Sequence, residues 1–250
     1  MVLAVALAGL GGLLVGSFLN VVAHRLPRGE SLVRPRSRCP QCGTQLRAVD
    51  NLPVVSWLAL RGRCHHCGAP ISARYPAVEL ATAGLYVAVA ASQDDALRIA
   101  LGLLVVTALV PITLIDLDHR IIPNRITGPA AIAALVAIVA LDTGFLLESV
   151  IAGIAGGGFF LIAAVLYPRG MGMGDVKLAG VLGLYLGRAV APAILMALVG
   201  GVVVGAAIIA RKGVTEGRKT AVPFGPFLAL GGLIAFFVGE NLVDAYIDTF

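Results

Sequence analysis

Two aspartates, Asp116 and Asp175, lie at the edges of strongly apolar stretches of the chain. An ionised aspartate near the centre of a bilayer costs roughly 2.5–3.5 kcal/mol on insertion scales, so such a residue usually serves a pathway, a proton relay or a reaction. When two carboxylates share one proton, one can take a proton from water while the other donates to a scissile carbonyl. The pair therefore predicts an intramembrane aspartyl active site.

Asp118, two positions after Asp116, is also an aspartate. On a helix this separation corresponds to about 200° of rotation, so only one of the two side chains can face an interior site. The alternative for Asp118 is a solvated charge at the helix end, paired with Arg120 or His119, and Pro123 then marks the end of the helix. Helix geometry alone does not say which of the two faces the interior.

Asp175 follows a glycine-rich run that contains Gly170, Gly172 and Gly174. A purely structural role is one alternative, because aspartate is among the best residues for capping a helix N-terminus. The glycines favour a functional role, since they let backbone approach backbone closely, as an extended peptide substrate in a cleft would require. Asp116 is expected to end one helix and Asp175 to begin another at the same membrane edge, so the two carboxylates can meet.

All four cysteines lie in one polar segment, as two Cys-x-x-Cys pairs: Cys39, Cys42, Cys64 and Cys67. Two tight turns of this kind present four thiolates tetrahedrally to one zinc ion, and Pro40, Gly43 and Gly68 are suitable turn residues. His65 and His66 are substitute ligands in principle, but four cysteines already close a site. Because such a site leaves no position for water, we predict that the zinc is structural.

The composition places these residues in a membrane protein. Hydrophobic residues make up 58% of the 250 residues, only 13% are charged, and the mean hydropathy is +0.93. A soluble domain of this length cannot hide so much apolar surface in one core. We therefore predict an all-α polytopic membrane protein, with a small four-cysteine loop after the first helix.

A helix that crosses a bilayer needs about 17–25 apolar residues. About eight transmembrane helices are expected, at 2–23, 77–92, 97–117, 128–146, 149–168, 176–191, 192–210 and 223–243. The first is expected to be a retained helix and not a cleaved signal, because it lacks a basic start and stays apolar throughout.

The Lys and Arg residues indicate the orientation. If the 25–76 loop is cytoplasmic, every Lys and Arg except Arg98 and Arg188 falls on that side, as expected for cytoplasmic loops. The loop and both aspartates then face the cytoplasm, both termini lie outside, and the location is the cytoplasmic (inner) membrane. Two disulfides or free thiols are the alternatives to zinc, and a reducing cytoplasm disfavours the disulfides.

Three regions are predicted: a first transmembrane helix at 1–24, the cytoplasmic zinc-binding loop at 25–76 and a transmembrane peptidase domain at 77–250. The basic charge of the loop is expected to attract anionic lipid headgroups. No nucleic-acid partner is expected, because no aromatic platform or recognition helix accompanies the charge.

Several stretches, in this order, resemble the bacterial type IV prepilin peptidases, bifunctional leader peptidases and N-methyltransferases of pilus and type II secretion systems. They are the segments 16–27, the double Cys-x-x-Cys loop, 74–80, 115–118, 172–178 and 223–226. The resemblance implies an aspartyl peptidase that cuts the basic leader of prepilins or pseudopilins after a glycine, with Asp116 and Asp175 as the catalytic pair. It also implies methylation of the new N-terminus with S-adenosylmethionine.

Candidate contacts of the substrate or of S-adenosylmethionine are Glu79, Gly172, Gly174 and Lys177. The alternative for Glu79 is a favourable acid in the first turn of a helix. Methylation rests on the resemblance, because no nucleotide-fold domain or recognisable S-adenosylmethionine site is apparent. A cluster of glycines at 153–158 is better explained by close helix packing.

Other classes fit less well. A transporter would place its carboxylates near the midplane, within related repeats that have broken helices. A metalloprotease is disfavoured because no His-Glu-x-x-His motif is present. A peptidase without methyltransferase activity, and a zinc-binding membrane scaffold of pilus or secretion machinery without enzymatic activity, remain the alternatives.

Overall fold

The computed structural model describes residues 2–167, 171–213 and 222–249 of the chain, and Gly170 of the glycine-rich run lies outside these ranges. The described residues are helical apart from turns, loops and two isolated β-bridges. The chain divides into two compact units, Met1–Asp95 and Ala96–Phe250. The expected division at 24/25 and 76/77 remains a prediction.

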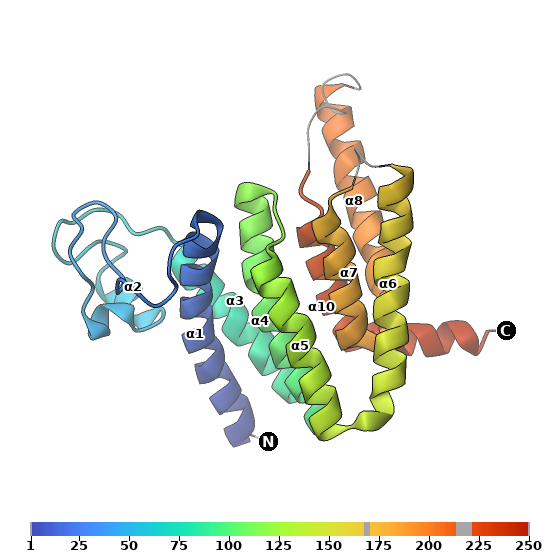
Figure 1. The fold of residues 1–250 in the computed structure, drawn as a ribbon. Helices are drawn as coiled ribbons and strands as arrows, with labels where there is room; N and C mark the ends of the chain where they lie inside the picture. The colour runs from blue at the N-terminus through green and yellow to red at the C-terminus, as the bar shows by residue number, and fades with distance from the viewer. Residues whose placement is uncertain (1, 168–170, 214–221, 250) are drawn as a thin grey trace. The chain divides into compact units, whose positions relative to one another are not determined.

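The first unit contains two long helices, α1 (Val2–Arg25) and α3 (Arg74–Ser92), which pack against each other (Figure 1). The four-cysteine loop between them holds three short 3₁₀ or α segments: η1 (Leu26–Arg28), η2 (Ala48–Asn51) and α2 (Val55–Ala59). Gly16 makes the close packing possible, because a Cβ at this position would lie 2.8 Å from the Glu79 Cα. Near the loop, the buried Asn20 amide donates to the Tyr75 carbonyl oxygen over 3.2 Å.

The second unit is a bundle of helices (Figure 1). In chain order they are α4 (Ala96–His119), α5 (Asn124–Leu141), η3 (Thr143–Phe145), α6 (Leu146–Leu166), α7 (Met173–Leu186), η4 (Gly187–Ala189), α8 (Val190–Lys212) and α10 (Gly225–Ile247). The most extensive contacts are α6 with α7, α8 with α10, and α4 with both α5 and α10. Gly153, Gly156 and Gly157 of the cluster at 153–158 do serve helix packing: a Cβ on Gly156, for example, would lie 3.0 Å from the Ala179 carbonyl oxygen of α7.

The predicted all-α membrane fold is confirmed, with a slightly different span count. Six helical stretches of the described residues are long and apolar enough to cross a membrane: Val2–Arg28, Ala96–His119, Asn124–Leu141, Thr143–Leu166, Met173–Lys212 and Gly225–Ile247. The two expected spans at 176–191 and 192–210 fall within one apolar stretch of 40 residues, Met173–Lys212, which η4 divides into α7 and α8. The 19-residue α3 is not among the six, because Arg74 and Glu79 lie in its first half.

Helix α7 is short. Its 14 residues extend about 21 Å at 1.5 Å per residue, whereas a hydrocarbon core is about 30 Å thick. It covers only part of a bilayer, and the chain then turns at Gly187, whose φ is +56°.

The two basic residues that the orientation analysis leaves outside are both paired with acids. The Arg98 guanidinium forms an ion pair with Glu240 and lies 5.2 Å from the centre of the Phe145 ring. Arg188 is 2.8 Å from Asp244. These contacts join the start of α4 and the short η4 to the second half of α10, at the end of the bundle away from Asp116.

Candidate active site and metal site

Asp116 lies in the last turns of α4, on the face that packs into the bundle. It is only 5% exposed, whereas Leu117 and Asp118 are exposed. The expectation that one of the two neighbouring aspartates faces the interior is therefore confirmed, and the buried one is Asp116. The Gly225 backbone N–H, at the first residue of α10, donates a 2.9 Å hydrogen bond to Asp116 Oδ2.

Asp175 is the third residue of α7 and is half-buried. The helix begins after Gly172, so Asp175 is not the N-cap itself. Its carboxylate does accept from the Gly172 backbone at the N-cap, so it also supports the start of the helix. The Asp116 and Asp175 carboxylates lie close enough for their charges to interact. Helix α7 contacts both α4 and α10, which explains how residues far apart in the sequence come close.

Of the glycines before Asp175, Gly174 packs against another part of the protein, and Gly172 lies beside the Asp175 carboxylate. A Cβ on Gly174 would lie 2.9 Å from Ile122 Cβ, so this glycine allows the α4–α5 connection to cross the start of α7. A Cβ on Gly172 would lie 3.3 Å from Asp175 Oδ2, so a side chain there would crowd the carboxylate. These contacts explain both glycines without a substrate, and a substrate contact at either one stays a prediction.

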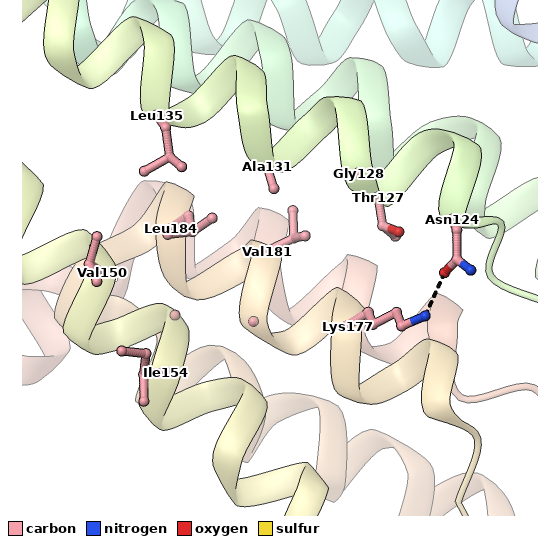
Figure 2. A pocket seen from close by; sticks show the side chains of 12 residues that line it. Asn124, Thr127, Gly128, Ala131, Leu135, Val150, Ile154, Lys177, Val181 and Leu184 are labelled. Carbon is pink, nitrogen blue, oxygen red and sulfur yellow. Dashed lines mark hydrogen bonds between the residues drawn. The ribbon is translucent and has the colours of Figure 1, made fainter.

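A groove of about 600 Å³ lies between α5, α6 and α7 (Figure 2). Its polar lining is at one end, where Lys177 Nζ donates a 2.9 Å hydrogen bond to Asn124 Oδ1 and Thr127 lies next to them. The remaining lining is apolar or glycine: Gly128, Ala131, Leu135, Val150, Gly153, Ile154, Gly180, Val181 and Leu184. Lys177 lies two residues from Asp175 but faces α5, and its hydrogen bond joins the start of α7 to the start of α5. Its predicted contact with substrate or cofactor is untested.

The four cysteines of the first unit come together. Their sulfur atoms all lie within 4.8 Å of one another. The two arms have the same backbone pattern, in which the Cys39 and Cys64 N–H groups donate to the Thr44 and Ala69 carbonyl oxygens over 2.9 and 2.8 Å. Gly43 and Gly68 turn the arms in the left-handed region, with φ of +69° and +70°. This geometry agrees with the turn chemistry expected from the sequence.

The sulfur atoms fit a tetrahedral metal site. Metal–sulfur bonds of about 2.3 Å give a tetrahedron with edges of about 3.8 Å, and the Cys39 and Cys67 Sγ atoms are 3.8 Å apart. The Thr44 hydroxyl and backbone lower the pKa of the Cys42 thiol to about 6. Although the Ala69 backbone N–H favours its thiolate, burial and hydrogen bonds with the other sulfur atoms raise the pKa of Cys67 to about 11. A bound cation would remove this difference, because it deprotonates coordinating thiols.

Comparisons with known proteins match both units. The family model for the bacterial peptidase A24 N-terminal domain matches residues 10–93, and that for the type IV leader peptidase family matches residues 103–210. The prepilin leader peptidase/N-methyltransferase of Aeromonas hydrophila is 38% identical, over 98% of this chain and 94% of the relative. The proteins of the same name from Dichelobacter nodosus and Pseudomonas aeruginosa are each 36% identical, over 96% and 95% of this chain and 93% and 91% of the relatives.

The chain belongs to the type IV leader peptidase family. No solved structure matches it. The N-terminal family match contains the cysteine cluster and Glu79, and the second match contains both aspartates. In this family member, Gly225 of α10 lies beyond the second match, although it contacts Asp116 directly.

Glu79 of this leader peptidase family member holds a turn of the cysteine loop. It is 7% exposed and is the sixth residue of α3, so it is not the first-turn acid considered as an alternative. Its Oε2 accepts the Val54 backbone N–H over 2.7 Å. Val54 has φ +60° and ψ −50°, and the Val55 N–H donates to the Pro53 carbonyl oxygen, which together form a rare and strained γ-turn. A role in substrate or cofactor contact stays a prediction.

Replacement of Glu79 by Ala is expected to release this turn. The Val54 N–H would lose its acceptor, at a cost of about 1–3 kcal/mol if it stays buried, so hydrogen exchange in the segment around Val54 should accelerate. Glu79→Gln is the matched control, because its amide oxygen can still accept the bond. Equal exchange rates in the Ala variant and the unchanged protein would show that Glu79 does not hold the turn.

Sequence reasoning missed three partners: Gly225 for Asp116, Asn124 for Lys177 and Val54 for Glu79. The signal for Gly225 was its place in the 223–226 stretch of the family resemblance. No pattern in the sequence pointed to the other two partners.

Proposed function

We propose that this protein cleaves the leader peptide of type IV prepilin-like proteins at the cytoplasmic face of the membrane. Asp116 and Asp175 would activate the water molecule. The observation that carries this proposal is the approach of the two carboxylates, one buried against the N-terminus of α10 and the other in the first turn of α7. The relatives, named prepilin leader peptidase/N-methyltransferase, support the substrate class and a second activity, methylation of the new N-terminus.

In the proposed reaction, the ionised carboxylate of the pair takes a proton from water as the water oxygen attacks the scissile carbonyl carbon. The other carboxyl group protonates the carbonyl oxygen, which gives a gem-diol. When the gem-diol collapses, the carbon–nitrogen bond breaks, the amine takes a proton from the first carboxyl, and a gem-diol hydroxyl returns a proton to the second. Both carboxyls are then restored, and the amine is the N-terminus of the product.

S-adenosylmethionine would supply the methyl group for this amine. No side chain of the described residues is assigned to binding it, so methylation rests on the family relationship. Zinc is proposed for the four-cysteine cluster, with a structural role, because Cys39, Cys42, Cys64 and Cys67 close the tetrahedron. The cluster would stiffen the loop between α1 and α3.

The orientation is proposed from the charge distribution, with the cysteine loop and the Asp116 end of the bundle in the cytoplasm and both termini outside. A substrate with its leader in the cytoplasm and an apolar segment in the bilayer would then reach the aspartates at the membrane edge. Anionic lipid headgroups would accompany the basic loop.

Mass spectrometry of a prepilin-like substrate tests this function. The substrate is incubated with the purified protein in lipid vesicles, with and without S-adenosylmethionine. We expect loss of the leader in both reactions, and a gain of one methyl group only when S-adenosylmethionine is present. Cleavage without a methyl gain would indicate a peptidase alone, and an intact substrate would favour the zinc-binding scaffold.

A further inference from the structure

The N-terminus of α10 is joined to Asp116 by one backbone hydrogen bond. Gly225 N–H donates to Asp116 Oδ2 over 2.9 Å, and both groups are buried. Within the described part of the chain this is the one hydrogen bond to that carboxylate, and it engages Oδ2. The first N–H groups of a helix carry partial positive charge and have no partner within their own helix, so they suit a carboxylate.

Residue 225 has no room for a side chain. A Cβ at this position would lie 2.7 Å from Oδ2, 3.1 Å from Cγ and 3.4 Å from Cβ of Asp116. The Asp116 side chain is short and would have to rotate away, which would break the hydrogen bond. Backbone conformation is not the reason for glycine here, because Gly225 does not have a positive φ. Alanine also suits a helix better than glycine does, by about 1 kcal/mol in a helix interior.

We propose that Gly225 is a positioning residue of the peptidase site. Its N–H fixes the rotamer of Asp116, so that the carboxylate is held close to Asp175, and its lack of a side chain makes this approach possible. The inference rests on the proposed cleavage reaction and adds to it a group outside the two aspartates. Since a catalytic group displaced by about 1 Å can lose about 100-fold in rate, the effect on turnover should be large.

The test compares the Gly225→Ala variant with the unchanged protein, and Gly158→Ala serves as the matched control. Gly158 lies within α6, and a Cβ there would meet no atom within 4 Å. We expect kcat for leader cleavage to fall about 100-fold in Gly225→Ala, with KM unchanged. The melting temperature should be equal or slightly lower, because the helix preference of alanine only offsets the lost hydrogen bond. Gly158→Ala should keep the kcat of the unchanged protein.

A second measurement separates positioning from a simple loss of folded protein. An isostere of the scissile peptide that carries a hydroxyl group imitates the tetrahedral intermediate and should bind through the two carboxylates. Its affinity should fall in Gly225→Ala by about the same factor as kcat, while the affinity for the uncleaved peptide stays unchanged. Unchanged cleavage in the variant, or slower cleavage with full isostere affinity, would overturn the inference.

If Gly225→Ala does not fold, two Asp116 variants test the hydrogen bond between Gly225 and Asp116 instead. Asp116→Asn retains an oxygen that can accept the Gly225 N–H, whereas Asp116→Ala leaves the N–H without a partner. The Asn variant should melt close to the unchanged protein and the Ala variant at a lower temperature; equal melting of both would contradict the hydrogen bond. If the unchanged protein cleaves no prepilin-like substrate, the proposed function fails, which is distinct from failure at Gly225 alone.

Discussion

Replacing either Asp116 or Asp175 with Asn should abolish leader cleavage. Loss of a group that takes part directly in hydrolysis lowers turnover by about 10⁴-fold or more in well-studied hydrolases, and neither carboxylate can be replaced by a neutral amide in the proposed proton transfers. The measurement is the single-turnover rate of cleavage in lipid vesicles, followed by mass spectrometry. Methylation of a substrate that has already been cleaved should continue, because it does not use the dyad.

Asp118→Asn is the matched control for Asp116→Asn. Asp118 is exposed two residues from Asp116, so its replacement should leave cleavage close to that of the unchanged protein. The folded state should also survive the two dyad substitutions, because an uncharged amide is less costly to bury than a carboxylate. Loss of cleavage in Asp118→Asn, with cleavage retained in Asp116→Asn, would show that Asp118 and not Asp116 takes part in the reaction.

The second large effect is expected at the cysteine cluster. Replacing Cys39 and Cys67 with Ser should remove the bound zinc completely, because two of the four ligands of a closed site are lost. The loop should then become sensitive to proteases, and methylation should fall more than cleavage, since the aspartates lie in the other unit. Metal analysis of the purified protein, limited proteolysis and the two activity assays measure these effects.

His65→Ala and His66→Ala provide the control for the metal site. Both residues are exposed and lie between the cysteines of the second arm, but four thiolates already complete the tetrahedron. These variants should retain zinc and both activities. Zinc retained in a protein with all four cysteines replaced would show that the ligand assignment is wrong.

Local patterns predicted the parts of the site that depend on neighbours in the sequence. The two-residue spacing of Asp116 and Asp118 was enough to show that only one faces the interior, because helix rotation determines which face each residue occupies. The Cys-x-x-Cys spacing similarly predicted the cysteine cluster, and Gly43 and Gly68 its turns. The span count differs slightly from the prediction, because α7 and α8 are separated only by η4 and α3 carries Arg74 and Glu79 in its first half.

The sequence by itself determined that this is an all-α membrane protein, that its cysteines form one cluster and that two aspartates are available for chemistry. Composition and short-range spacing suffice for these conclusions, because bilayer thickness and helix geometry constrain them directly. Only the tertiary structure decided that Gly225, 109 residues away, holds Asp116, and that Glu79 supports a strained turn at Val54. Such contacts depend on which helix faces and loops pack together, and no local pattern encodes that choice.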